Sequence, residues 1–225
     1  MNTPRWVLSP ELLEFLPRIE EFLAMVDLVG IDNCHDIWLD FGMHEGPLKV
    51  HDGYFTCPVL SAEGCEFYLN YADKCPDLFK PNEEEKPEYQ IPEIVLPVGL
   101  STITKELARE ALWPLFHVMF GTPPNHFSSV QLARYKEGVG TGWHHDTDSE
   151  FTAVVSLAPG RHTGGGTMLL PRGAAAPARV VMPLPQGSAL LFNGRSTLHR
   201  GLPTYRGERN LLVFWMMHHE NNIVP

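Results

Sequence analysis

Six short apolar segments between residues 128 and 217 restrict the folds open to this chain more than any other feature of its sequence. Gly and Pro residues, rather than helical patterns, separate these segments from one another. Short strands at this density are typical of a β-sandwich or barrel and not of alternating β-α units. We therefore predict a double-stranded β-helix, or jelly roll, for this part of the chain. Its predicted strands are residues 130–135, 151–157, 167–170, 179–182, 189–192 and 210–217.

Two amphipathic helical patterns precede this β-rich region. The first follows Ser9, Pro10 and Glu11, which suit an N-cap and a first helical turn, and its apolar positions keep helical spacing up to Gly30. The second begins at Ser101, and Gly-Thr-Pro-Pro after residue 120 ends it. Extended segments are predicted at 37–41, 54–58 and 91–98, and the Pro- and Glu-rich run 80–92 is predicted to be a solvated loop.

Length and composition are those of one globular domain. The chain has 225 residues, of which 44% are hydrophobic and 20% are charged, which is enough for a substantial core. We expect an α+β, β-rich domain spanning 1–225. In it, a helical and mixed N-terminal part (1–127) packs its helices on one sheet of the jelly-roll core (128–217).

A candidate metal site lies in the sequence Gly-Trp-His-His-Asp at residues 142–146. In an extended segment alternate side chains share a face, so His144 and Asp146 lie on one face with Cα atoms ~6.5 Å apart, while His145 points away. His199, which comes 53 residues after Asp146, can supply a third ligand from another strand. Two imidazoles and one carboxylate suit a non-haem ferrous site, because they leave three octahedral positions open.

The residues around these candidate ligands resemble a known family, the iron(II)/2-oxoglutarate-dependent oxygenases, and within it the prolyl and lysyl hydroxylase branch. His144-His-Asp followed by Phe151-Thr is similar to the catalytic domain of procollagen lysyl hydroxylases, and so is Gly194-Arg-x-x-x-His-x-Gly-Leu-Pro-Thr-x-Arg-Gly-x-Arg. The resemblance covers residues 128–217. It also includes the run from Tyr135 to Asp146, Gly164-Gly-Gly-Thr-Met-Leu-Leu and Gly187-Ser-Ala-Leu-Leu-Phe.

The resemblance implies a role for each matched residue. His144, Asp146 and His199 would ligate Fe(II), Arg209 would bind the distal carboxylate of 2-oxoglutarate, and Tyr135 would reach the same carboxylate. A guanidinium suits this role because it offers two parallel donors to a carboxylate. The C1 carboxylate and 2-oxo oxygen of the keto acid would occupy two open iron positions and O2 the third. The implied reaction hydroxylates a C–H bond and releases succinate and CO2, with ascorbate as a possible reductant.

The substrate is left open by these motifs. The resemblance favours an amino-acid side chain in a protein or peptide, whereas a compact chain also suits a small metabolite or a free amino acid. A nucleobase is less favoured, and a non-catalytic metal- or ligand-sensing module least, because both the triad and the co-substrate arginine are present. Asp148 and Glu150 could attract a cationic substrate or could simply be solvated. His145 could contact substrate or could point outward from its strand. Trp143 could form part of the pocket wall or could pack in the core.

Charge is divided unevenly along the chain, which carries a net charge of -10. Residues 1–130 hold 21 acidic and 8 basic side chains, whereas residues 131–225 hold 6 acidic and 9 basic ones. This distribution argues against a protein that coats nucleic acid non-specifically. Six arginines besides Arg209 could recognise an anion or could serve solubility: Arg161, Arg172, Arg179, Arg195, Arg200 and Arg206.

The first third of the chain bears on localisation and redox state. Acidic residues interrupt every candidate signal sequence, and no run approaches the roughly 20 apolar residues needed to cross a bilayer. We therefore expect an intracellular, cytoplasmic protein without membrane association; its oligomeric state is not predicted. The cysteines are irregularly spaced among histidines, which favours reduced thiols over a structural zinc site. They are Cys34, Cys57, Cys65 and Cys75.

Overall fold

The computed structural model describes residues 4–30, 34–83, 86–170 and 177–219. Its helices are α1 (Pro10–Val29), α2 (Cys34–Asp40), α3 (Ala62–Lys74) and α4 (Val98–Phe120). Its strands are β1 (Lys49–His51), β2 (Tyr54–Pro58), β3 (Lys80–Pro81), β4 (Pro92–Val95), β5 (His126–Tyr135), β6 (Phe151–Ser156), β7 (His162–Gly164), β8 (Thr167–Leu170), β9 (Arg179–Val181), β10 (Ser188–Asn193), β11 (Leu198–Gly201), β12 (Thr204–Gly207) and β13 (Arg209–Met217).

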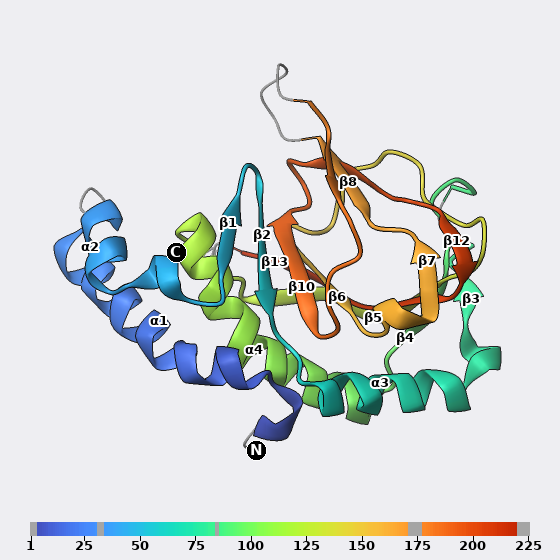
Figure 1. The fold of residues 1–225 in the computed structure, drawn as a ribbon, viewed down its shortest axis with the longest axis horizontal. Coiled ribbons are helices and arrows are strands. Elements are labelled where there is room, and N and C mark those ends of the chain that lie inside the picture. Colours follow the sequence, from blue (N-terminus) through green and yellow to red (C-terminus); the bar gives the residue numbers. More distant parts are fainter. Residues whose placement is uncertain (1–3, 31–33, 84–85, 171–176, 220–225) are drawn as a thin grey trace, which may run out of the picture.

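The strands form the predicted β-rich jelly roll. The major sheet has eight strands in the order β1-β2-β10-β6-β13-β5-β4-β3, and two smaller sheets have the orders β11-β8-β9 and β12-β7. Helices α1, α3 and α4 gather on one side of the major sheet, and the smaller sheets lie on its other side (Figure 1). The six predicted strands correspond to β5, β6, β8, β9, β10 and β13.

Strand β13 packs against a hydrophobic cluster on each face of the major sheet. Leu212 and Phe214 are completely buried in the large cluster that includes the helices. Leu211 and Val213 face the other way and pack with Tyr135 in a second cluster on the side of the small sheets. Because alternate side chains point to opposite faces, a strand covered on both sides reads as a continuous apolar run. The second cluster lines the candidate site described below.

The two predicted helices are present in the structure. Helix α1 begins as expected, with the Ser9 hydroxyl accepting a hydrogen bond from the Leu12 amide at 3.1 Å. Helix α4 ends at Gly121, which adopts φ 73°, a conformation that favours glycine. It begins at Val98, before the predicted Ser101, because the Ser101 amide already donates to the Pro97 carbonyl at 2.8 Å.

Several N-terminal predictions were wrong or incomplete. Residues 37–41, predicted to be extended, lie mostly in α2, where Trp38 packs edge-on against Phe22 of α1. Helix α3 was not predicted, although Ser61 caps it and its buried residues follow helical spacing. The predicted loop 80–92 contains the short strand β3, which pairs with β4. Strands β1 to β4 therefore extend the major sheet at both edges.

Replacing a buried leucine in α4 tests how this helix packs against the major sheet. Leu107 is completely buried, so Leu107→Ala is expected to lower the free energy of unfolding by about 2–5 kcal/mol. Urea denaturation followed by circular dichroism measures the change. The matched control is Leu28→Ala in α1, because Leu28 is 79% exposed. Equal effects of the two substitutions would contradict the packing described here.

Candidate metal centre

A pair of backbone hydrogen bonds brings the predicted ligands together across 55 residues of sequence. His144 and His199 form an isolated antiparallel bridge, in which each amide donates to the other's carbonyl at 2.9 Å. His199 lies in β11, whereas His144 lies in the irregular segment between β5 and β6. The Asp146 amide donates to the Gly194 carbonyl at 3.1 Å, which fixes the far end of the same segment.

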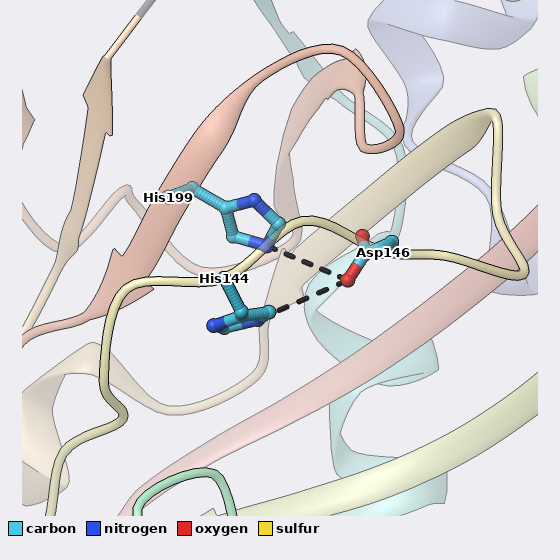
Figure 2. Close-up of side chains that lie close together, drawn as sticks. All are labelled: His144, Asp146 and His199. Carbon is cyan, nitrogen blue, oxygen red and sulfur yellow. Dashed lines mark ion pairs between the residues drawn. The ribbon is translucent and has the colours of Figure 1, made fainter.

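The side chains of His144, Asp146 and His199 converge (Figure 2). Their potential ligand atoms all lie within 4.8 Å of one another. Asp146 Oδ1 lies 3.8 Å from His144 Nε2 and 3.6 Å from His199 Nε2. No other group of three or more such side chains occurs among the residues that the structure describes. His145 is exposed and is not part of the group.

Hydrogen bonds to the backbone orient both imidazoles. His144 Nδ1 lies 2.9 Å from the Gly142 carbonyl, and His199 Nδ1 lies 2.9 Å from the Thr197 carbonyl. Because a carbonyl only accepts, each Nδ1 carries the proton, and each Nε2 keeps a lone pair that can bind a metal. Burial lowers the pKa of His199, against the opposing effect of Asp146, and so favours its neutral, metal-binding form.

Arg209 is a buried cation without an acidic partner. It is 6% exposed at the start of β13, and its Nη1 donates to the Gly166 carbonyl at 2.9 Å. Its guanidinium carbon lies 5.3 Å from the centre of the Tyr135 ring. Within the described parts of the chain no carboxylate forms an ion pair with Arg209, and burial lowers its pKa. A buried charge needs a partner, so this arrangement fits an anionic ligand.

One inner cavity joins this cation to the candidate metal ligands. The inner cavity has a volume of about 60 Å³. Its lining includes the candidate metal ligands His144, Asp146 and His199, and also Tyr135 and Arg209. The remaining lining is mostly apolar and includes residues of β10 and β13. A small anion bound to Arg209 can therefore reach the metal ligands without leaving the protein interior.

A larger outer cavity opens from the same ligands. The outer cavity, of about 420 Å³, shares His144, Asp146 and Tyr135 with the inner cavity. Its walls include the aromatic rings of Tyr89 and Trp215, and it carries the carboxylates of Glu93 and Asp148. Among the described residues that line it, none is a lysine or an arginine. When the Gln131 side-chain amide is oriented to satisfy its hydrogen bonds, its nitrogen donates to the Glu93 carboxylate at 2.6 Å. This hydrogen bond holds the Glu93 carboxylate in the cavity wall.

Tyr89 is a site residue that the sequence interpretation missed. It belongs to the run predicted as a solvated loop, yet its hydroxyl donates to the Trp143 carbonyl at 3.3 Å and its ring lies 5.3 Å from that of His144. The adjacent Glu88 carbonyl accepts from the Gly142 amide at 2.7 Å. An aromatic residue inside a Pro- and Glu-rich run was the available signal.

Other candidate residues lie outside both cavities. The Trp143 ring packs under Arg200, whose guanidinium carbon is 4.9 Å from the ring centre. Glu150 accepts from the His218 amide at 3.4 Å. Arg161 and Arg179 form ion pairs with Asp73 and Asp52, both at 2.7 Å. Arg195 and Arg206 are exposed, and Arg172 lies outside the described residues.

The described cysteines lie outside the one group of potential metal ligands found among the described residues. Cys57 and Cys65 are buried free thiols, and burial raises the pKa of each to about 12. Neither they nor Cys75 joins a group of three potential ligands in the described ranges, and the side chain of Cys34 is outside them. Across the same ranges, none of the helices has the length and apolar character to cross a membrane.

Comparisons with known proteins agree with this geometry. Residues 130–217 match the model of the 2OG-Fe(II) oxygenase superfamily. No curated protein matches the sequence significantly. A solved prolyl-4-hydroxylase from Pseudomonas putida is 20% identical over 75% of this chain and 94% of that chain, with a TM-score of 0.58. A 2OG-Fe(II) oxygenase family oxidoreductase from Burkholderia pseudomallei is 19% identical over 89% of this chain and 91% of that chain, with a TM-score of 0.56. A viral collagen prolyl hydroxylase from Paramecium bursaria Chlorella virus-1, in complex with 2OG, is 20% identical over 73% of this chain and 96% of that chain, with a TM-score of 0.54. At these identities the structural likeness shows the fold.

Proposed function

We propose that this chain, whose residues 130–217 match the model of the 2OG-Fe(II) oxygenase superfamily, is a dioxygenase that hydroxylates an amino-acid side chain in a protein or peptide. The observation that carries the proposal is an inner cavity lined by the two-histidine, one-aspartate group and by a buried arginine that has no acidic partner among the described residues. The reaction inserts one oxygen atom of O2 into a C–H bond. The other oxygen atom enters succinate as 2-oxoglutarate loses CO2.

Each residue around the inner cavity has a proposed task. His144, Asp146 and His199 hold Fe(II), which, with 2-oxoglutarate and O2, supplies the oxidising power when bound. Arg209 binds the distal carboxylate of 2-oxoglutarate, and Tyr135, whose ring lies beside the guanidinium, contacts the same end. The apolar residues of β10 and β13 exclude water from the space between the two ends.

The outer cavity supports a polypeptide side chain that carries a positive charge. The carboxylates of Glu93 and Asp148 attract a cation, and the described residues that line the cavity include no lysine or arginine to oppose them. The Tyr89 ring already has a cation beside it, because the Lys86 ammonium lies 5.9 Å from the ring centre. The same carboxylates disfavour a substrate that bears phosphodiester groups. Two of the similar structures are named prolyl hydroxylases, one of them for collagen, and two others of comparable TM-score are named as enzymes of nogalamycin biosynthesis. The proposed polypeptide substrate therefore rests on the outer cavity.

The proposal is tested with purified protein, Fe(II), ascorbate and 2-oxoglutarate. Succinate release and a mass increase of about 16 Da are measured on peptides that contain lysine, proline or norleucine, and on free amino acids and nucleosides. We expect turnover of lysine peptides and little turnover of norleucine peptides, which have a similar length without the charge. Turnover of free amino acids alone would refute the polypeptide substrate. Absence of both succinate and 2-oxoglutarate binding would refute the enzymatic function.

Neutralising a carboxylate of the outer cavity is expected to weaken use of a cationic peptide. Asp148→Asn should raise the KM for the lysine peptide several-fold and change kcat little, because a charge at the mouth acts mainly on binding. Glu150→Gln is the matched control, since Glu150 lies on the same segment but does not line the cavity. Equal KM values for Asp148→Asn and the unmodified protein would rule out this role for Asp148.

A further inference from the structure

We infer that Thr152 is a positioning residue that restricts Asp146 to metal ligation through one oxygen atom, an inference that rests on the proposed function. Thr152 lies in β6 and is 2% exposed. Its hydroxyl lies 2.5 Å from Asp146 Oδ2, whereas Asp146 Oδ1 faces the two imidazoles. The two carboxylate oxygens therefore have different partners before any metal binds.

The direction of this hydrogen bond follows from the available donors. An ionised carboxylate only accepts, so the Thr152 hydroxyl must donate to Asp146. The Ser149 hydroxyl lies 3.2 Å from the Thr152 hydroxyl and accepts from the Met216 amide at 3.1 Å. Ser149 is 1% exposed, and its hydroxyl donates to the Phe151 carbonyl at 3.0 Å. This network connects the Asp146 carboxylate to the backbone of β13.

Gly194 lies close to the same carboxylate and to the Thr152 hydroxyl. A Cβ atom at this position would lie 2.3 Å from the Thr152 hydroxyl oxygen and 2.4 Å from Asp146 Oδ2. Any larger residue would therefore displace one of the two bonded atoms. The Gly194 amide and carbonyl also bond the metal-ligand segment, to the Glu150 carbonyl and the Asp146 amide, both at 3.1 Å. Oδ2 is thus confined between the Thr152 hydroxyl and the backbone of Gly194.

Engaging Asp146 Oδ2 affects how many coordination positions of the metal stay open. An octahedral ion held by two imidazoles and one carboxylate oxygen keeps three positions open. A 2-oxo acid that binds through two atoms and an O2 molecule need all three. If Oδ2 also ligated the metal, only two would remain. By engaging Oδ2, Thr152 keeps the third position free.

The experiment counts the open positions directly, using Mn(II) as the probe and bound water as the readout. Water-proton relaxation of the Mn(II)-loaded protein is expected to report about three exchangeable waters. Thr152→Val, which has nearly the same shape but no hydroxyl, is expected to report about one water fewer and to bind 2-oxoglutarate more weakly, by roughly tenfold or more. Thr152→Ala removes the same hydroxyl with a smaller side chain and is expected to behave alike.

Two further variants separate positioning from packing. Thr152→Ser keeps the hydroxyl and is expected to restore the water count and the 2-oxoglutarate affinity. Thr104→Val is the matched control, because Thr104 in α4 is also buried and its hydroxyl also has a side-chain partner, Tyr68, at 2.8 Å. An unchanged water count in Thr152→Val, or a loss that Thr152→Ser does not restore, would overturn the inference. Failure of the unmodified protein to bind Mn(II) would instead refute the metal site itself.

Discussion

Replacing His199 by alanine is expected to abolish Fe(II) binding and, with it, succinate release. The His199 Nε2 atom is one of the three potential ligand atoms within 4.8 Å of one another, and it lies 3.6 Å from Asp146 Oδ1. Loss of a direct ligand should cost more than the roughly 10- to 100-fold in metal affinity typical of residues that only orient ligands. The fold should persist, because the hydrogen bonds between His144 and His199 involve their backbones.

The measurement is a competition between the protein and a chelator for Fe(II) under anaerobic conditions, with circular dichroism to verify folding. His145→Ala is the matched control, because this neighbouring histidine is exposed and lies outside the ligand group. We expect it to bind Fe(II) as the unmodified protein does, whatever it does to substrate turnover. If His199→Ala bound Fe(II) normally, or if His145→Ala lost it, the proposed ligands would be wrong.

The parts of the fold that could be predicted are those with a local physical signal. Strand β13 is covered on both faces and appears in the sequence as one long apolar run, and the N-cap of α1 is marked by Ser9 and Pro10. The position of β2 beside β10 has no such signal, since it depends on backbone pairing between segments more than 130 residues apart. Helix α2 was missed because Ile37 and Trp38 also suit a strand, and only packing against α1 decides between the two.

For the candidate site too, some residues could be predicted from the sequence and others could not. His144 and Asp146 were identified because alternation along an extended segment relates residues two apart. The residues that surround them come from elsewhere in the chain. The Tyr89 hydroxyl donates to the Trp143 carbonyl from 54 residues away, and the Gly194 carbonyl accepts from the Asp146 amide, 48 residues before it. Sequence spacing can indicate which atoms bind a metal, whereas the residues that hold those atoms in place require the three-dimensional structure.

Replacing Arg209 by methionine is expected to separate the metal site from the co-substrate site. Truncating one partner of a buried, hydrogen-bonded charge pair costs about 2–5 kcal/mol, which corresponds to a roughly 30- to 5,000-fold higher Kd for 2-oxoglutarate. Fe(II) binding should be unchanged, because Arg209 is not in the ligand group. Isothermal titration of the Mn(II)-loaded protein with 2-oxoglutarate measures the first quantity, and chelator competition measures the second.

Stability distinguishes a binding role for Arg209 from a structural one. Arg209 is buried with one hydrogen bond, to the Gly166 carbonyl, and without a carboxylate partner in the described ranges. Replacing such a charge with an apolar side chain of similar length should leave the free energy of unfolding unchanged or increase it. The control is Arg206→Met, because Arg206 is exposed on β12. A large loss of stability with normal 2-oxoglutarate affinity would show that Arg209 supports the fold instead of the ligand.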